Sequence, residues 1–198
     1  EEEELSKLKN WLNDHGCRII FLHQLSDYRA SGKLIITDVD YIILCTLLNV
    51  LCDTVRRDLD YHTSELVIIL SQTYYMIDSK GNKNYLQQSI KNNELYKDKQ
   101  FWEEYLTYSI TKEITKTLKR DEKIKETKKN SDYKLSNIVF AQLLTLIDNM
   151  YEFGLDPKDM KELIQPKIKF YKLNESFTKT INDVIESKEA ETKIKKEE

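Results

Sequence analysis

Glycine and proline are scarce in this sequence, which has 4 Gly and 2 Pro among 198 residues. Average usage is about 7% for Gly and about 5% for Pro. Because an all-β protein needs these residues for its many tight turns, the scarcity favours helices. Cysteine is also rare, and two of the 3 Cys lie in an apolar run: Cys17, Cys45 and Cys52. The odd number predicts buried free thiols in a reducing compartment rather than a disulfide framework.

No apolar run is long enough to cross a membrane. The longest, from Tyr41 to Cys52, would measure about 18 Å as a helix, against a hydrocarbon core of about 30 Å. No basic segment followed by an apolar one opens the chain, so we expect no signal peptide. The net charge of -3 and pI near 5.8 give no general attraction to nucleic acid or to an anionic membrane. We therefore expect a cytoplasmic protein without a transmembrane segment.

Apolar residues recur at helical spacing along most of the chain. Several residues suit helix starts: Thr37 or Asp38 before the longest apolar run, Asp60 or Thr63 before a segment that continues to Ile77, Asp98 before an aromatic-rich segment, Ser136 before a second apolar run that stops at Gly154, and Asp156 followed by Pro157. The near-complete hydrophobicity of the longest run predicts a buried core helix, and "DSKGNKN" from Asp78 predicts a turn. These patterns predict an all-α fold, an irregular array of about eight to nine antiparallel helices that is similar to helical repeats.

The length of the chain predicts one domain. Its expected parts are a charged N-terminal edge at residues 1–4, a single helical domain at residues 5–186, and a charged C-terminal tail at residues 187–198. Within the domain, residues 119–134 carry one aliphatic side chain, that of Ile124, among many charges. This stretch is either a solvated helical extension or a flexible loop, and it is the expected internal break.

The sequence lacks the motifs that carry catalysis. It has no phosphate-binding glycine loop, no G-x-S-x-G and no H-E-x-x-H. His15, Cys17 and His23 form an H-x-C-x₅-H cluster, but zinc would need a fourth ligand and a different spacing. We predict no catalytic residue, no cofactor and no metal. An enzyme would instead require a polar pocket that brings His15, His23 or His62 to a carboxylate or a cysteine.

Aromatic residues at helical spacing are the candidates for partner binding. Such side chains supply much of the binding energy in interfaces, and a groove between helix pairs suits a partner helix or a small GTPase. The residues chosen on this basis, each of which is also a candidate for the core, are Phe101, Trp102, Tyr105 and Met160.

Basic residues gather at three places in the sequence, and acidic residues dilute the second and third of them. If they converged on one concave face, they would support the alternative function of a nucleic-acid-binding helical repeat. The dilution makes nucleic acid an unfavoured partner, while peripheral contact with membrane headgroups stays open. The patch consists of Arg56, Arg57, Lys119, Arg120, Lys128 and Lys129.

The order of "LSQTYY", "GNKNYLQQSI" and "LYKDKQFWEEYLTYSITKEI" resembles the helical module of the set-binding factors, which are myotubularin-related pseudophosphatases with DENN exchange domains. The later "LLTLIDNMYEFGLD" is similar to the closing helices of that module, so the resemblance covers about residues 35–170. It implies a regulatory or scaffolding domain in membrane traffic or signalling, with no catalytic residue to carry over. We therefore expect a non-enzymatic protein-interaction domain. The matching positions are Tyr74, Tyr75, Tyr85, Leu86, Phe101, Trp102 and Glu103.

Overall fold

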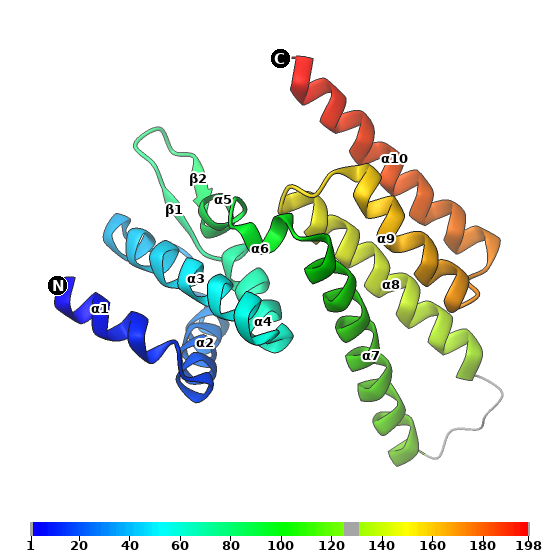
Figure 1. The fold of residues 1–198 in the computed structure, drawn as a ribbon, viewed down its shortest axis with the longest axis horizontal. Coiled ribbons are helices and arrows are strands. Elements are labelled where there is room, and N and C mark those ends of the chain that lie inside the picture. The colour runs from blue at the N-terminus through cyan, green and yellow to red at the C-terminus, as the bar shows by residue number, and fades with distance from the viewer. Residues whose placement is uncertain (1, 125–130, 198) are drawn as a thin grey trace. The chain divides into compact units, whose positions relative to one another are not determined.

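The computed structural model describes residues 2–124 and 131–197 (Figure 1). The chain divides into two compact units, Glu1–Lys97 and Asp98–Glu198, which we call the N-terminal unit and the C-terminal unit. The all-α fold class is confirmed, with ten helices in the described residues where the sequence predicts about eight to nine. That residues 5–186 act as one domain stays a prediction.

The N-terminal unit combines helices with one short β-hairpin. Two of its helices are short, since α5 has 5 residues and α6 has 4. They bring the number of helices above the predicted number. The elements in chain order are α1 (Glu2–Trp11), α2 (His15–Ala30), α3 (Asp38–Asp58), α4 (Tyr61–Ser71), β1 (Tyr75–Ile77), β2 (Lys83–Tyr85), α5 (Leu86–Ile90) and α6 (Glu94–Lys97).

Helix α3 is the centre of the N-terminal unit. It begins where predicted, because the Thr37 side chain accepts a hydrogen bond of 3.1 Å from the Asp40 amide. Its apolar side chains Leu48, Leu51 and Cys52 are fully buried. The helix packs against α4 and α5, so the predicted core helix is confirmed.

The β-hairpin replaces a helical segment that the sequence predicts. We expected the fourth helix to continue to Ile77, but α4 ends at Ser71 and β1 pairs with β2 in antiparallel register. Aromatic and branched side chains favour extended backbone here, which overrides the helical spacing. The predicted turn after this segment is confirmed: the Asp78 carboxylate accepts hydrogen bonds of 2.8 Å from the amides of Lys80 and Asn82.

The C-terminal unit holds four helices in its described part. Helix α8 packs against α7, and α10 packs against both α8 and α9 (Figure 1). Its core includes Trp102, Met150 and Met160, all fully buried. The four helices are α7 (Lys99–Ile124), α8 (Ser131–Glu152), α9 (Pro157–Phe170) and α10 (Glu175–Glu197).

Most of the predicted helix boundaries in this unit are confirmed. The Asp156 side chain caps α9 and Pro157 occupies its first turn, while Gly154 ends α8 with a positive φ of 86°. Pro166 lies inside α9 and does not end it. The start of α8 is corrected: the sequence predicts Ser136 as its cap, but the helix already begins at Ser131.

The charged segments are largely helical. In the predicted break at residues 119–134, α7 continues to Ile124 and α8 resumes at Ser131, and residues 125–130 lie outside the described part of the chain. Helix α10 continues to Glu197 through the segment expected to be a charged tail. Of the helices described, each is too short or too polar to cross a bilayer.

Candidate binding groove

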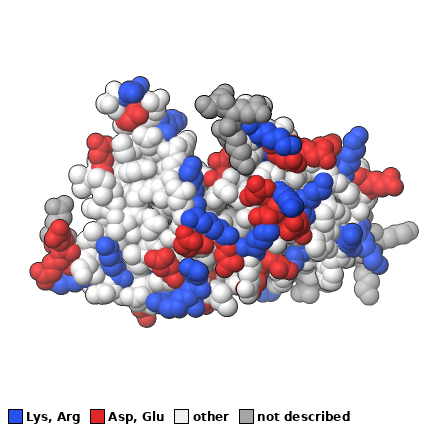
Figure 2. All heavy atoms as spheres, turned by 45° about the horizontal axis from the view of Figure 1, so that its top comes forward, with Lys and Arg blue, Asp and Glu red and all other residues white. Residues whose placement is uncertain are grey.

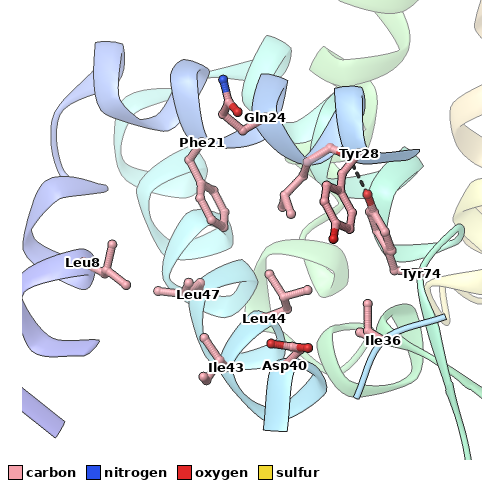
Figure 3. A pocket seen from close by; sticks show the side chains of 11 residues that line it. Leu8, Phe21, Gln24, Tyr28, Ile36, Asp40, Ile43, Leu44, Leu47 and Tyr74 are labelled. Atoms are coloured by element: carbon pink, nitrogen blue, oxygen red, sulfur yellow. Dashed lines mark hydrogen bonds between the residues drawn. The ribbon is translucent and has the colours of Figure 1, made fainter. Parts of the chain in front are cut away.

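An apolar groove of about 430 Å³ lies in the N-terminal unit between α1, α2 and α3 (Figure 3). Its two long walls come from α2 and α3, and each wall uses residues at positions i, i+3, i+4 and i+7, which share one face of a helix. Leu8, Ile36 and Tyr74 complete the lining. The walls are formed by Phe21, Gln24, Leu25 and Tyr28 on α2, and by Asp40, Ile43, Leu44 and Leu47 on α3.

The floor of the groove is held in place by the core. Leu47 and Tyr74 are 2% and 1% exposed, and the Tyr74 hydroxyl donates a hydrogen bond to the Leu25 carbonyl (dashed in Figure 3). Burial raises the pKa of Tyr74 above its ordinary value of 10.0. The hydroxyl, which is already protonated at neutral pH, therefore donates this bond to a still higher pH. This bond joins the segment before the hairpin to α2 and fixes one end of the groove.

The rim of the groove exposes apolar side chains and one carboxylate. Leu8 and Tyr28 are 36% and 53% exposed, and the Lys33 ammonium lies 5.0 Å from the centre of the Tyr28 ring. Asp40 is the one charged residue of the lining, and its carboxylate accepts a 2.7 Å hydrogen bond from the Thr37 hydroxyl. The groove therefore offers apolar contact with a single negative charge at its mouth.

Further apolar side chains are exposed on the helices and loops that build the groove. Figure 2 shows a broad face of the N-terminal unit, in the left half of the view, on which few charged side chains appear. Exposed apolar side chains beside an apolar groove are typical of an interaction site. The exposed residues, each more than half accessible to solvent, are Ile20, Ile35, Val39 and Ile42.

The residues that the sequence proposes as partner anchors lie in the core of the C-terminal unit. Phe101, Trp102, Tyr105 and Met160 are 5%, 0%, 3% and 0% exposed. The rings of Phe101 and Tyr105 stack at 5.6 Å, and Trp102 lies 6.4 Å from Phe153. Buried side chains present no surface to a partner in this conformation. Their burial favours a packing role, and partner binding by these four residues stays a prediction.

The predicted basic patch is divided between the two units. Arg56 and Arg57 lie in the last turn of α3, and the Arg57 guanidinium binds the Asp58 carboxylate at 2.8 Å. Lys119 and Arg120 lie on α7, where they line a hollow of about 610 Å³ together with Lys112, Thr115 and Lys116. Lys128 and Lys129 fall outside the described residues. Because the two groups belong to different units, their convergence on one face stays a prediction.

A buried arginine joins two connections of the N-terminal unit, and the sequence analysis missed it. Arg18 is 2% exposed and donates hydrogen bonds of 3.2 Å to the carbonyls of Leu12 and Asn13. Its guanidinium also lies 3.0 Å from the Asp58 carboxylate and 3.5 Å from that of Asp60. Arg18 thus ties the α1–α2 connection to the α3–α4 connection.

Asp60 caps α4 as predicted, and it also binds His15. Its carboxylate accepts hydrogen bonds from the Thr63 amide at 3.1 Å and the Thr63 hydroxyl at 2.7 Å, and it lies 2.9 Å from His15 Nδ1. Burial acts to raise the pKa of Asp60, but the bonds from Thr63 and His15 outweigh it and the pKa is lowered. His15 is the first residue of α2.

The lowered pKa of Asp60 predicts a loss of stability in acid. The charged carboxylate is favoured in the folded state, so its stabilisation is complete above the ordinary pKa of about 4 and is lost as the pH falls through the lowered value. We expect urea unfolding between pH 6 and pH 3 to show a smaller acid destabilisation for Asp60→Asn than for the unchanged chain. Equal pH dependence of the two proteins would contradict the assignment.

The histidines lie outside the groove, and His62 Nδ1 lies 3.7 Å from the Glu65 carboxylate. His15 pairs with Asp60, but neither residue lines the groove. His23 and His62 have ring centres 6.5 Å apart. In the parts of the chain that the structure covers, no group of three or more His, Cys, Asp or Glu side chains could hold a metal ion.

One comparison with known proteins identifies the family. A family model described as "SBF2: Myotubularin protein" matches residues 2–195. The chain belongs to the SBF2 family. The match covers both units and confirms the resemblance to the set-binding factors, over a longer range than the motifs suggest. SBF2 membership points to a non-catalytic domain of the pseudophosphatase type. No curated protein and no solved structure matches the chain.

Proposed function

We propose that this SBF2 chain is a non-enzymatic protein-interaction domain of membrane-traffic or signalling machinery, and that its groove binds an amphipathic helix of a partner protein. The observation that carries the proposal is the pair of matching walls on α2 and α3. Small GTPases are one class of protein that we expect to supply such a helix.

The spacing of the walls suits a helical occupant. Each wall extends over seven residue steps, which is about 10 Å or two helical turns. A helix that lies between the walls presents its own apolar side chains at i, i+3, i+4 and i+7, as helices bound in grooves do. The volume of about 430 Å³ falls within the range of binding pockets, about 300–1,000 Å³.

The residues that line the groove indicate which side chains the bound helix carries. Most of the lining is apolar, so burial of each large aliphatic side chain of the partner contributes about 1.5–3 kcal/mol. Gln24 and Asp40 supply the polar contacts. Because Asp40 lies exposed at the mouth, we expect a lysine or arginine of the partner helix to approach its carboxylate.

The proposal is tested by affinity enrichment from cell lysate with three forms of the full chain. Tyr28→Asp places a charge on the groove rim, and Leu118→Asp is the matched control because Leu118 is an exposed apolar residue of α7, at 54%. We expect Tyr28→Asp to reduce recovery of a specific partner at least tenfold, which corresponds to the loss of about one buried aromatic contact. The control should recover the partner like the unchanged chain.

Cross-linking of the recovered partner then identifies the bound segment. The proposal requires that the segment is an amphipathic helix with a basic residue beside its apolar face. It is contradicted if Tyr28→Asp retains every partner, if Leu118→Asp loses the same partners, or if the cross-linked segment is not helical.

A further inference from the structure

The corner between α9 and α10 exposes an aromatic ring among lysines. Phe170 is the last residue of α9 and is 76% exposed. Lys167 and Lys169 lie in the last turn of the same helix, and Lys172 follows in the turn with a left-handed φ of 51°. Lys169 and Lys172 are exposed, whereas the Lys167 ammonium donates a 2.9 Å hydrogen bond to the Thr107 hydroxyl of α7. We propose that this corner binds the surface of an anionic lipid bilayer, with the Phe170 ring among the headgroups and the ammonium groups of Lys169 and Lys172 against the phosphates.

The position of Phe170 does not follow from packing of α9. The helix buries Met160, Ile164 and Ile168 at helical spacing, and these residues define its inner face. Phe170 lies two residues beyond Ile168, which places it about 200° away around the helix axis and therefore on the outer face. The outer face of an amphipathic helix normally carries polar residues, and Lys169 fits that rule. Phe170 departs from it.

The charge around the ring selects an anionic surface. The acidic residues in the first half of α9 are compensated, because the Lys99 ammonium contacts Asp159 at 2.5 Å and Glu162 at 3.2 Å. The second half of α9 and the following turn carry lysines, and the nearest acidic residue along the chain is Glu175, the first residue of α10. Cations at a helix C-terminus have an ordinary cause in the helix dipole. The dipole does not account for the exposed ring beside them, which contacts the Tyr171 ring edge to face at 4.9 Å. An aromatic ring flanked by cations is typical of peripheral contact with anionic lipid.

Such contact would be weak and reversible. One inserted ring together with Lys169 and Lys172 gives an affinity of at most the order that a single lipid chain provides. The corner belongs to the C-terminal unit and the groove to the N-terminal unit, so this inference stands independently of the proposed function.

The test is co-sedimentation of the full chain with vesicles of phosphatidylcholine alone and of phosphatidylcholine with phosphatidylserine. We expect binding to the phosphatidylserine vesicles only. Phe170→Ser should weaken it about tenfold and Lys169→Glu on the order of tenfold, because the second change removes an attraction and adds a repulsion. The matched controls are Leu118→Ser on α7 for the ring and Lys97→Glu on α6 for the charge, both at exposed positions. They should bind like the unchanged chain.

A second measurement places the ring directly. In Phe170→Trp, the emission of the introduced tryptophan should shift to the blue when phosphatidylserine vesicles are added, because the indole leaves water. The inference is overturned if the unchanged chain does not sediment with phosphatidylserine vesicles, if Phe170→Ser sediments equally well, or if the emission of the introduced tryptophan does not move. Binding that depends on the lysines alone would assign the corner to soluble anions and also overturn it.

Discussion

Replacement of Arg18 by methionine is expected to lower the free energy of unfolding of the N-terminal unit by about 3 kcal/mol. Removal of one partner from a buried ion pair costs about 3–5 kcal/mol, because the other charge stays buried without compensation. We expect the lower end of this energy range because one carboxylate partner stays partly in water: the Asp58 side chain is 33% exposed, whereas that of Asp60 is 9% exposed. Hydrogen exchange of the full chain, followed in α2 and α4, measures the effect within this unit.

Arg57→Met is the matched control for Arg18→Met. Both arginines contact Asp58, but the Arg57 side chain is 55% exposed whereas that of Arg18 is 3% exposed. An exposed ion pair contributes at most about 1 kcal/mol, so we expect little change in exchange. Similar effects of the two substitutions would show that burial of Arg18 does not set its contribution.

Trp102→Ala is expected to lower the free energy of unfolding of the C-terminal unit by about 3–5 kcal/mol, because it removes a large buried aromatic side chain and leaves a cavity. Trp102 is fully buried and its ring packs edge to face with those of Phe101 and Tyr105. Hydrogen exchange in α7 and α8 measures the loss.

The other tryptophan of the chain provides the comparison for Trp102. Trp11 is 63% exposed in α1, so Trp11→Ala should change the exchange rates little. This pair of substitutions also separates packing from partner binding. If Trp102→Ala left the C-terminal unit as stable as before and abolished binding of a partner, the original assignment of Trp102 as a partner anchor would be correct.

Local chemistry made most helices predictable. Thr37, Asp60 and Asp156 cap their helices through side-chain hydrogen bonds to amides two or three residues ahead, and such contacts depend only on neighbouring residues. The hairpin was not predictable in the same way. Tyr75 has its partners at Tyr85 in β2 and in an isolated parallel bridge to Ile35, and contacts across that sequence distance override local spacing.

Prediction of the groove requires knowledge of which helices pack against each other. Its two walls are visible as apolar spacings within α2 and α3, but nothing local indicates that these faces lie opposite each other and leave a space. The same limit applies to Arg18, whose carboxylate partner Asp60 is 42 residues away. The aromatic residues of α7 illustrate a related limit. Helical spacing identifies Phe101 and Tyr105 as members of one face, but it does not say whether another helix covers that face.

The central claim, that the N-terminal unit binds a partner helix through its groove, is tested most directly by site-specific photocross-linking in cells. Benzoylphenylalanine replaces Tyr28 on the groove rim in one form of the full chain and Leu118 on α7 in the other. The account predicts cross-links from position 28, and not from position 118, to the apolar face of an amphipathic helix that carries a lysine or arginine. The absence of protein cross-links from position 28, or the same cross-links from both positions, would contradict it.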